Sequence, residues 1–460
     1  MTRAFDAASY ADPHGRLLAA EGAEVRRAIY PHHRPVVGRV LADSLVRRLM
    51  QDGRLIPAQR VEGDPAAPEV LAHPVLWPVT YPAEWPAIML ADAGLLLLEL
   101  ARELLASGFC LDDGTPRNVL FDRAAPVFVD FTSVVDAPGT PVWRPFDQFS
   151  REVLHPLYLS AWDRGAEWRY VAITQPRAGV AASTVVRAMP LSFRLRRPIR
   201  AGVLGAMARL ERNAAPAERT SHLDGRAAAS RSRAHLELFF RHLEREVQRL
   251  RRQVSDANRR GWVDYYDADV AAADTERKTR AIGELLQRLA PRRLLDLGTN
   301  TGRYAIMAAE LGVRVVAVDA DEGCLTKLYE TARRRHLAVT PLLMDAACPT
   351  PAFGLGGTEF PSAATRLSAD VTMALGVVHH LVRRSDYTLD RIGDALTAFG
   401  SRVVVLEFVG PGDPRAAQLG LGRRPGYTLE AAQAALGRQY ARVTTLPVYG
   451  DRQLVVGERQ

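Results

Sequence analysis

From about residue 261 to its end, the chain alternates short apolar runs with amphipathic segments, and this alternation limits the possible folds more than any other feature. The apolar runs are continuous and partly β-branched, as buried parallel strands are. They are Leu294–Leu297, Val313–Val318, Leu342–Met344 (the weakest), Val371–Leu375 and Val403–Phe408. Amphipathic segments such as Gly302–Glu310 and Glu322–Arg335 lie between them. The pattern predicts an α/β domain with a largely parallel sheet.

The chain closes on two further runs, Arg442–Val448 and Gln453–Val456, separated by the turn Tyr449-Gly450-Asp451. So short a connection joins antiparallel strands, because parallel neighbours need a long crossover. We therefore expect the sheet to end on an antiparallel hairpin.

The segment Leu294-Leu-Asp-Leu-Gly-Thr-Asn-Thr-Gly302 combines a strand, a turn and the start of a helix. Gly298 and Gly302 permit a tight turn and close approach of a ligand, at which the helix N-terminus then points. Asp296 precedes the first glycine, where its carboxylate can pair with an ammonium group. Asp319 ends the second strand about twenty residues further on, and is placed to accept hydrogen bonds from both hydroxyls of a ribose.

The spacing Asp-x-Gly-x-Asn-x-Gly, which includes Asn300, differs from the G-x-G-x-x-G of dinucleotide dehydrogenases. LLDLGTNTG followed by VVAVDAD resembles the first two motifs of class I S-adenosylmethionine-dependent methyltransferases. The resemblance covers about Trp262 to Gln460 and implies a Rossmann-like, seven-stranded sheet with S-adenosyl-L-methionine as cofactor. It also implies that Asp345 contacts the adenine amino group, that Lys278 lies near the methionine carboxylate, and that the segment WVDYY at 262–266 folds over the cofactor.

Two histidines follow the fourth strand in Ala374-Leu-Gly-Val-Val-His-His-Leu381. In the methyltransferase fold the end of that strand lies beside the transferable methyl group, so His379 or His380 is a candidate general base for a hydroxyl or amine. His380 is favoured, with His379 turned toward the protein, and a structural or cofactor-positioning role for both stays open. Glu407, at the end of the fifth strand, is expected to contact substrate or orient a histidine, or else to be a solvated acid. No carboxylate cluster accompanies the histidines, so no metal site is predicted.

The first 190 or so residues carry a second pattern. A long apolar helix, expected over Ala87–Ser107, leads to a loop with Asp113 and Asn118, and Asp130 follows in an apolar strand. The five-residue step from Asp113 to Asn118 resembles the catalytic loop of kinase-like phosphotransferases, and Asp130 resembles their metal-binding aspartate. This half is therefore expected to be an α+β kinase-like domain, with an unrelated hairpin carrying turn acids as the alternative.

Several parts of an active kinase are missing from this half. No lysine precedes Lys278, so the phosphate-pairing lysine is absent unless an arginine such as Arg27 replaces it. No glycine-rich phosphate loop is visible, and Thr132 stands where the DFG motif has glycine. A degenerate kinase-like domain is favoured over an active one.

The chain as a whole resembles a group of large bacterial methyltransferases named after nodulation proteins. These have a kinase-like half followed, in order, by segments like WVDYY, LDLGTNTG, HHL and LEFV of this chain. That resemblance implies a glycan or secondary-metabolism setting and a small-molecule or sugar-type acceptor.

Residues 191–260 form an arginine-rich helical connector, so that the predicted domains are 1–190, 191–260 and 261–460. From Arg194 to Arg260 there are seventeen arginines against seven acids. Apolar residues spaced alternately by four and three predict a helix with one seam, namely Leu236, Phe240, Leu243, Val247, Leu250 and Val254. Packing on its own domain is favoured, with a coiled coil, and hence an oligomer, as the alternative.

The net charge of +8 would suit a nucleic acid, but the bias to arginine, alanine and glycine is typical of a GC-rich genome, so such a partner is not favoured. The N-terminus lacks an apolar signal segment, and no apolar stretch is long enough to span a bilayer. The three cysteines, Cys110, Cys324 and Cys348, show neither metal nor disulfide spacing. These features predict a cytoplasmic protein.

The sequence therefore predicts methyl transfer from S-adenosylmethionine to a small-molecule or sugar-type acceptor, with oxygen favoured over nitrogen. One alternative is a phosphotransferase that uses Asp113, Asn118 and Asp130 with magnesium. A non-catalytic binding or scaffold protein is another, and RNA methylation is the third.

Overall fold

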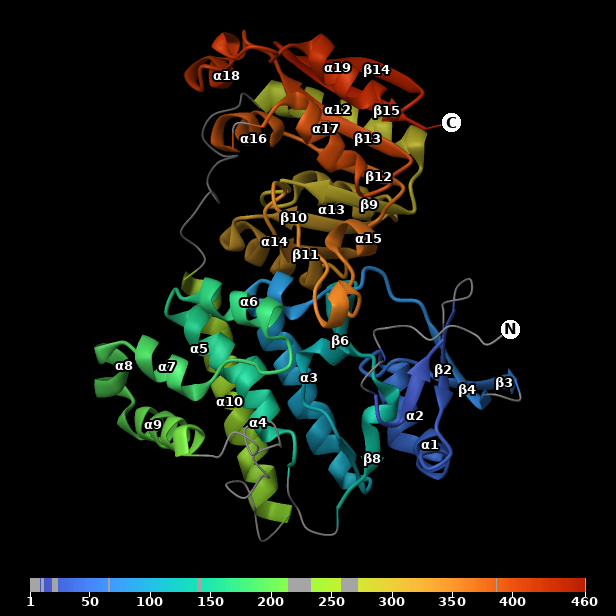
Figure 1. Cartoon of the computed structure of the whole chain (residues 1–460), viewed down its shortest axis with the longest axis vertical. Coiled ribbons are helices and arrows are strands. Elements are labelled where there is room, and N and C mark those ends of the chain that lie inside the picture. Colours follow the sequence, from blue (N-terminus) through green and yellow to red (C-terminus); the bar gives the residue numbers. More distant parts are fainter. Residues whose placement is uncertain are drawn as a thin grey trace. The chain divides into compact units, whose positions relative to one another are not determined.

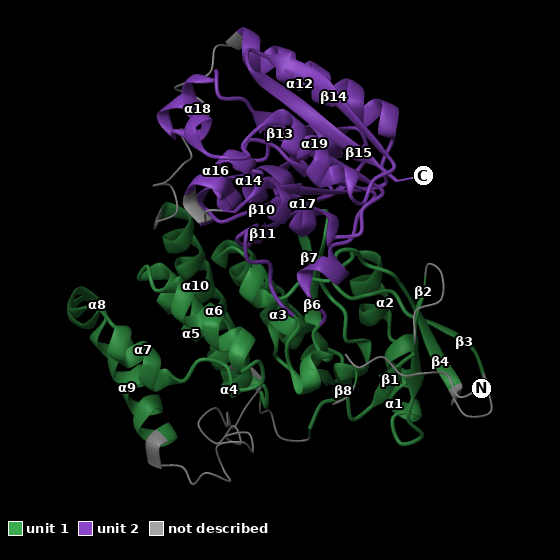
Figure 2. Ribbon diagram, turned by 45° about the horizontal axis from the view of Figure 1, so that its top comes forward, with its two compact units in different colours: residues 1–257, 352–360 green, residues 258–351, 361–460 purple. Residues whose placement is uncertain are grey.

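The computed structural model describes residues 9, 12–18, 24–64, 67–138, 143–213, 233–257, 272–385 and 387–459. Residues 214–232 of the connector and the WVDYY segment at 262–266 lie outside the described residues. The chain divides into two compact units, residues 1–257 with 352–360, and residues 258–351 with 361–460 (Figure 2). Among the described residues, no helix combines the length and the apolar character needed to cross a membrane.

The first unit opens with a four-stranded antiparallel sheet in the order β1-β2-β4-β3 (Figure 1). The strands are β1 (Gly15–Leu17), β2 (Glu24–Ile29), β3 (Gln59–Asp64) and β4 (Ala67–Pro74). Two helices, α1 (Arg34–Ala42) and α2 (Ser44–Gln51), come between β2 and β3 in the chain. Helix α2 begins after Asp43 because that carboxylate accepts the backbone N–H groups of Leu45 and Val46.

Helix α3 (Ala87–Ala106) forms the buried centre of the first unit, as its run of apolar residues predicts. The hairpin of β6 (Val119–Asp122) and β7 (Ala125–Phe128) follows, and β5 (Phe109–Leu111) pairs antiparallel with β8 (Val134–Asp136). The long helix expected before the Asp113 loop is therefore confirmed.

The rest of the first unit is helical. Its helices are α4 (Phe146–Phe149), a π-helical turn (Ser150–Leu154), α5 (His155–Ala161), α6 (Gly165–Thr174), α7 (Ala182–Ala188), α8 (Leu191–Arg196), α9 (Pro198–Asn213) and α10 (Arg233–Ala257). Helix α10 packs against α3 and α5, and its predicted seam is buried there. Packing within its own unit is thus confirmed, and the coiled-coil alternative is wrong because the seam is already covered. The division of this unit at residue 190 stays a prediction.

The second unit is built on a seven-stranded sheet in the order β11-β10-β9-β12-β13-β15-β14. Its strands are β9 (Arg293–Leu297), β10 (Arg314–Asp319), β11 (Val339–Leu343), β12 (Val371–Ala374), β13 (Val403–Val409), β14 (Arg442–Tyr449) and β15 (Arg452–Glu458). β9 to β13 pair in parallel, whereas β15 runs antiparallel to both β13 and β14. The predicted α/β alternation and the closing hairpin are both present.

Helices connect these strands: α12 (Ala272–Leu289), α13 (Arg303–Glu310), α14 (Glu322–Arg334), α15 (Ala363–Arg366), α16 (Val378–Ser385), α17 (Leu389–Thr397), α18 (Pro414–Gln418) and α19 (Leu429–Gly437). Gly312 follows the end of α13 with a φ of +88°, which a glycine adopts without strain, so it suits the position after the C-cap of this helix.

The strand order marks one edge of the sheet as the candidate binding edge. The chain builds outward from β9 through β10 to β11 and then returns to place β12 on the other side of β9. In open α/β sheets, ligands bind at the carboxyl ends of the strands beside such a reversal. That edge carries the glycine turn after β9, Asp319 at the end of β10, and the histidine pair after β12.

Candidate active site

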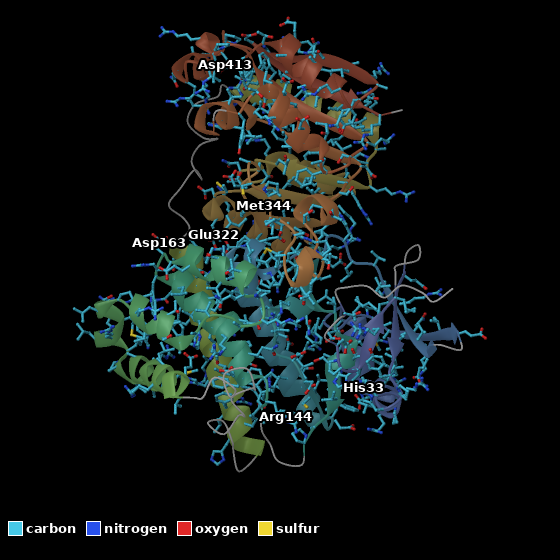
Figure 3. The ribbon with its side chains drawn as sticks, viewed as in Figure 1. His33, Arg144, Asp163, Glu322, Met344 and Asp413 are labelled. Atoms are coloured by element: carbon cyan, nitrogen blue, oxygen red, sulfur yellow. The ribbon has the colours of Figure 1, made fainter. Side chains whose placement is uncertain are left out.

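A cavity of about 430 Å³ lies at this edge of the second unit. Seven of the predicted site residues line it: Lys278, Gly298, Asn300, Asp319, Asp345, His379 and His380. Asp296, Gly302 and Glu407 do not line it. Met344, labelled in Figure 3, directly follows β11 and also lines the cavity.

The two glycines of the turn after β9 serve different purposes. Both have positive φ, +75° at Gly298 and +82° at Gly302. A Cβ at Gly298 would lie 2.8 Å from the Cβ of Val377, so this glycine lets the turn approach the loop after β12 beside the cavity. A Cβ at Gly302 would collide with Leu328 of α14. Gly302 therefore allows the start of α13 to lie close to Leu328, a role that the sequence pattern did not distinguish from ligand approach.

Local hydrogen bonds hold the acids of the strand ends in place. Asp319 accepts the backbone N–H of Asn300 at 2.7 Å and that of Asp321 at 2.9 Å, and burial raises its pKa. Asp296 accepts the hydroxyl of Thr299 at 2.7 Å, and its burial raises its pKa to about 6. Asp345 accepts the backbone N–H of Ala347 at 2.9 Å. Each carboxylate has further lone pairs, so these acids are oriented before any ligand arrives.

A chain of alternating charges lies at the side of the cavity. Lys278 Nζ donates to Glu407 Oε2 at 2.6 Å, and the two side chains are 8% and 0% exposed. The other carboxylate oxygen of Glu407 lies 3.5 Å from Arg452, which donates to Asp413 at 2.7 Å. Burial alone would raise the pKa of Glu407, but Lys278 and Arg452 hold it below its usual range. The expectation of a solvated acid at this strand end is wrong, because Glu407 is a fully buried counter-ion for two cations.

The histidine pair lies in the first turn of α16. His379 is 1% exposed and its two ring nitrogens have no hydrogen-bond partner among the described residues. The half-buried ring of His380 lies beside it, with 4.2 Å between ring centroids. Burial, helped by His380 and Arg452, lowers the pKa of His379 to about 3, and burial also lowers the pKa of His380. Both imidazoles are therefore neutral near pH 7.

Sequence reasoning missed the basic side chains that line the cavity with the histidines. They are Arg383 of α16, Arg415 of α18 and Arg452 of β15. The Arg452 guanidinium lies over the ring of Tyr449, 5.2 Å from its centroid. Burial and the charge of Arg452 lower the pKa of Arg415. The available signal was the Tyr-Gly-Asp-Arg turn of the closing hairpin, since that hairpin returns next to β13.

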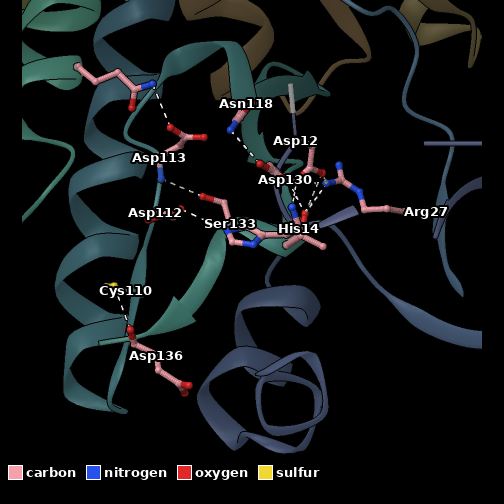
Figure 4. A network of polar contacts seen from close by, with 12 residues as sticks. Asp12, His14, Arg27, Cys110, Asp112, Asp113, Asn118, Asp130, Ser133 and Asp136 are labelled. Carbon is pink, nitrogen blue, oxygen red and sulfur yellow. Dashed lines mark hydrogen bonds and ion pairs between the residues drawn. The ribbon is translucent and has the colours of Figure 1, made fainter. Parts of the chain in front are cut away.

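In the first unit, the structure also brings the kinase-like residues together, but there the acids are hydrogen-bonded to other side chains of the protein (Figure 4). Arg27 of β2 donates to Asp130 at 2.7 Å and to Asp12 at 2.6 Å. Thr132 donates to the same Asp130 oxygen at 2.9 Å, and Asn118 donates to the other one at 3.2 Å. All three partners of Asp130 belong to the protein itself, and the arginine suggested in place of the missing lysine is hydrogen-bonded directly to Asp130.

Asp113 belongs to the same network but bonds elsewhere. It accepts from Gln148 at 3.1 Å, and its backbone N–H donates to Ser133 at 3.0 Å (Figure 4). Burial and the nearby Asp130 raise its pKa. Within the described ranges, no group of three or more histidine, cysteine or acidic side chains is arranged to hold a metal ion.

Comparison with known proteins supports the relationship inferred from the motifs. No family model matches the chain. The chain is 28% identical over 436 residues to nodulation protein NoeA of Rhizobium meliloti (strain 1021). The matched stretch covers 91% of this chain and 87% of that protein. The resemblance to large bacterial proteins named after nodulation is therefore confirmed across both halves of the chain.

Among solved structures, the chain is similar to monomeric WbdD, with 19% identity, a TM-score of 0.31, and coverage of 43% of each chain. Another WbdD structure, described as a bifunctional kinase-methyltransferase, shows 16% identity, a TM-score of 0.31 and 42% coverage of each chain. Less than half the length of WbdD is thus matched. Magnesium protoporphyrin IX methyltransferase (ChlM) from Synechocystis PCC 6803 with bound SAM shows 14% identity and a TM-score of 0.31, over 45% of this chain and 95% of that one.

Proposed function

We propose that the second unit is an S-adenosylmethionine-dependent methyltransferase that methylates an oxygen of a small-molecule or sugar-type acceptor. The observation that carries the proposal is a single cavity that joins a glycine turn and fixed strand-end carboxylates to a pair of neutral imidazoles. The first feature suits a nucleoside cofactor, and the second suits a hydroxyl that must lose a proton.

The residues present fit the cofactor. Asp319 and Asp345 line the cavity and would accept hydrogen bonds from the ribose hydroxyls and the adenine amino group. Asp296 does not line it, so its contact with the ammonium group stays a prediction. At Gly298 a Cβ would be blocked by Val377, so the backbone itself forms the wall that a ligand approaches. Lys278 already forms an ion pair with Glu407. We propose that the positive charge of Lys278 also attracts the methionine carboxylate of the cofactor, so that it is shared between the two carboxylates. When bound, the cofactor supplies an electrophilic methyl carbon.

The histidines favour an oxygen acceptor. A hydroxyl is a weak nucleophile until its proton is removed, and an imidazole that is neutral near pH 7 can accept that proton. His380, half-buried at the cavity wall, is proposed as this base. The buried and unpartnered nitrogens of His379 would gain a hydrogen bond from an acceptor, which would help to orient it. A cavity of about 430 Å³ falls within the range of small-ligand sites.

For the kinase-like half we propose a binding or supporting role without phosphoryl transfer. The metal-binding aspartate of an active kinase holds a metal ion with free carboxylate oxygens. Both oxygens of Asp130 are instead bonded within the protein, to Arg27, Thr132 and Asn118.

The test is methyl transfer by the full chain. S-adenosylmethionine with a tritiated methyl group is incubated with a panel of oligosaccharides, free sugars, phenols, amines and RNA, and release of S-adenosylhomocysteine is followed in parallel. We expect label in hydroxyl-bearing compounds, and less label with Asp319→Ala when S-adenosylmethionine is below saturation. Label confined to amines would overturn the choice of oxygen, and label confined to RNA would favour RNA methylation. Cofactor binding without transfer to any acceptor would favour a non-catalytic protein.

A further inference from the structure

The helices α8 and α9 of the first unit (Figures 1 and 2) carry an apolar stripe of exposed side chains. Its side chains and exposed fractions are Leu191 69%, Leu195 74%, Ile199 82%, Val203 55% and Leu210 57%. Elsewhere in the described part of the chain, exposed large apolar residues occur singly, for example Leu238 at 63% on α10. Single exposed residues need no explanation, whereas a contiguous stripe marks an interaction site.

The stripe belongs to helices that are firmly anchored on their other side. In α9, Ile199, Val203 and Leu210 share one face because steps of four and seven residues return to nearly the same direction. Leu204 and Ala208, on the opposite face, are 5% and 1% exposed, and α9 packs there against α7. The apolar side chains of the stripe are therefore presented outward by a fixed helix.

The inner side of α8 is anchored in the same way. The Phe193 ring packs against those of Tyr158 and Trp162, with centroid distances of 5.7 and 5.1 Å. Leu191 and Leu195 are left on the outside.

Exposed arginines flank the stripe. They are Arg187, Arg194, Arg196, Arg197 and Arg209. The one acid between residues 187 and 211 is Glu211, which pairs with Arg151. Arg196, Arg197 and Arg209 form no ion pair with any described residue. The stripe is thus apolar along its centre and cationic at its margins.

We propose that this surface, the α8–α9 face, docks on an anionic lipid bilayer. Interfacial helices insert an apolar stripe at the boundary of headgroups and acyl chains, while basic side chains reach the phosphates beside it. A second copy of the chain fits less well, because the arginines of two such faces would repel each other. A nucleic acid would leave the aliphatic centre without a partner, since single-stranded sites add aromatic stacking surfaces that this face lacks. The proposal is independent of the methyl acceptor.

The experiment is cosedimentation of the full chain with vesicles of phosphatidylcholine, with and without phosphatidylglycerol. We expect binding to the vesicles that contain phosphatidylglycerol, weakened by added salt. The double variant Leu195→Ser with Ile199→Ser should bind at least about tenfold more weakly, because two large aliphatic side chains no longer leave water. Arg196→Gln with Arg197→Gln should weaken binding by about 25-fold, at roughly fivefold for each charge.

Leu238→Ser is the control, since it removes a leucine that is 63% exposed and lies outside the α8–α9 face, and it should bind as the parent does. Unchanged near-UV circular dichroism shows that each variant is folded. Equal sedimentation with both kinds of vesicle, or a folded Leu195→Ser/Ile199→Ser variant that binds like the parent, would overturn the proposal. A self-association that this variant abolishes, without vesicle binding, would assign the face to a second copy. Salt-sensitive RNA binding without vesicle binding would assign it to nucleic acid.

Discussion

The two units place acids at the ends of buried strands, yet these acids have opposite surroundings. In the second unit, Asp319 is held by backbone N–H groups and keeps acceptor capacity toward a cavity. In the first unit, Asp130 meets Arg27, Thr132 and Asn118 on its two oxygens. An acid at a strand end therefore indicates a ligand site only when its remaining lone pairs face open space.

The largest effect is expected at the histidine pair of the second unit. His380→Ala should lower kcat by about 10²–10⁴-fold with little change in cofactor affinity, because a general base is lost. Burial lowers the pKa of His380 from its ordinary 6.5, so the parent rate should rise with pH in the acid range and be level near pH 7. The check is a pH profile of methyl transfer for both proteins, with the exposed His242→Ala as control. A variant with the parent's rate and profile would show that positioning alone suffices.

The ion cluster of the first unit can be broken at its arginine. Arg27→Met should lower the free energy of unfolding by about 3–5 kcal/mol, because Asp12 and Asp130 then face each other without their cation. Burial and the nearby Asp130 raise the pKa of Asp12 while Arg27 lowers it, so loss of Arg27 raises the pKa of Asp12 further and the folded variant binds more protons than the unfolded chain. The stability of the variant should therefore fall as pH rises through that raised pKa, and the deficit should be smallest in acid.

Urea unfolding at two pH values measures this deficit. Arg39→Met is the matched control: it removes an arginine paired with Asp136 at the surface, both about half exposed, and should change stability by at most about 1 kcal/mol. Equal stability of Arg27→Met and the parent would contradict the description of Asp130 as an acid held by Arg27.

A smaller effect is expected at Asp319, whose carboxylate keeps acceptor capacity toward the cavity of the second unit. Asp319→Ala should weaken S-adenosylmethionine binding by about 1–3 kcal/mol, the cost of leaving polar partners without an acceptor. Titration calorimetry provides the measurement, and Glu310→Ala on the exposed side of α13 is the control. Unchanged affinity in a folded Asp319→Ala variant would rule out the ribose assignment.

The smallest effect is expected at Asp130 itself. Asp130→Asn should leave the ATP consumption of the protein unchanged and close to zero, because the carboxylate is already engaged. ATP turnover that disappears in this variant would instead favour the phosphotransferase alternative, with Asp113, Asn118 and magnesium.

The sequence predicted the second unit well because its determinants are local. The strands appear as continuous apolar runs, and the turn at Gly298 needs a residue that adopts positive φ. The hairpin turn at Tyr449-Gly450-Asp451 likewise forces β14 and β15 to be antiparallel neighbours. Each of these features can be recognised within about ten residues of chain.

What could not be predicted depends on contacts distant in sequence. Glu407 resembles a strand-end acid until Lys278 and Arg452 are seen to close on it from α12 and β15. The role of Gly302 depends on Leu328 of a later helix. The segment 352–360, which follows β11 by only a few residues, is part of the first unit. No local pattern records any of these partners.

We propose that the second unit holds a nucleoside cofactor, whereas the kinase-like site of the first unit is filled by the protein's own side chains. Native mass spectrometry of the full chain, incubated with S-adenosylmethionine and ATP–magnesium together, tests both parts in one sample. We predict one S-adenosylmethionine for each chain, a smaller fraction of cofactor-bound chains in Asp319→Ala, and no ATP. A chain that retains ATP and no S-adenosylmethionine would contradict the account.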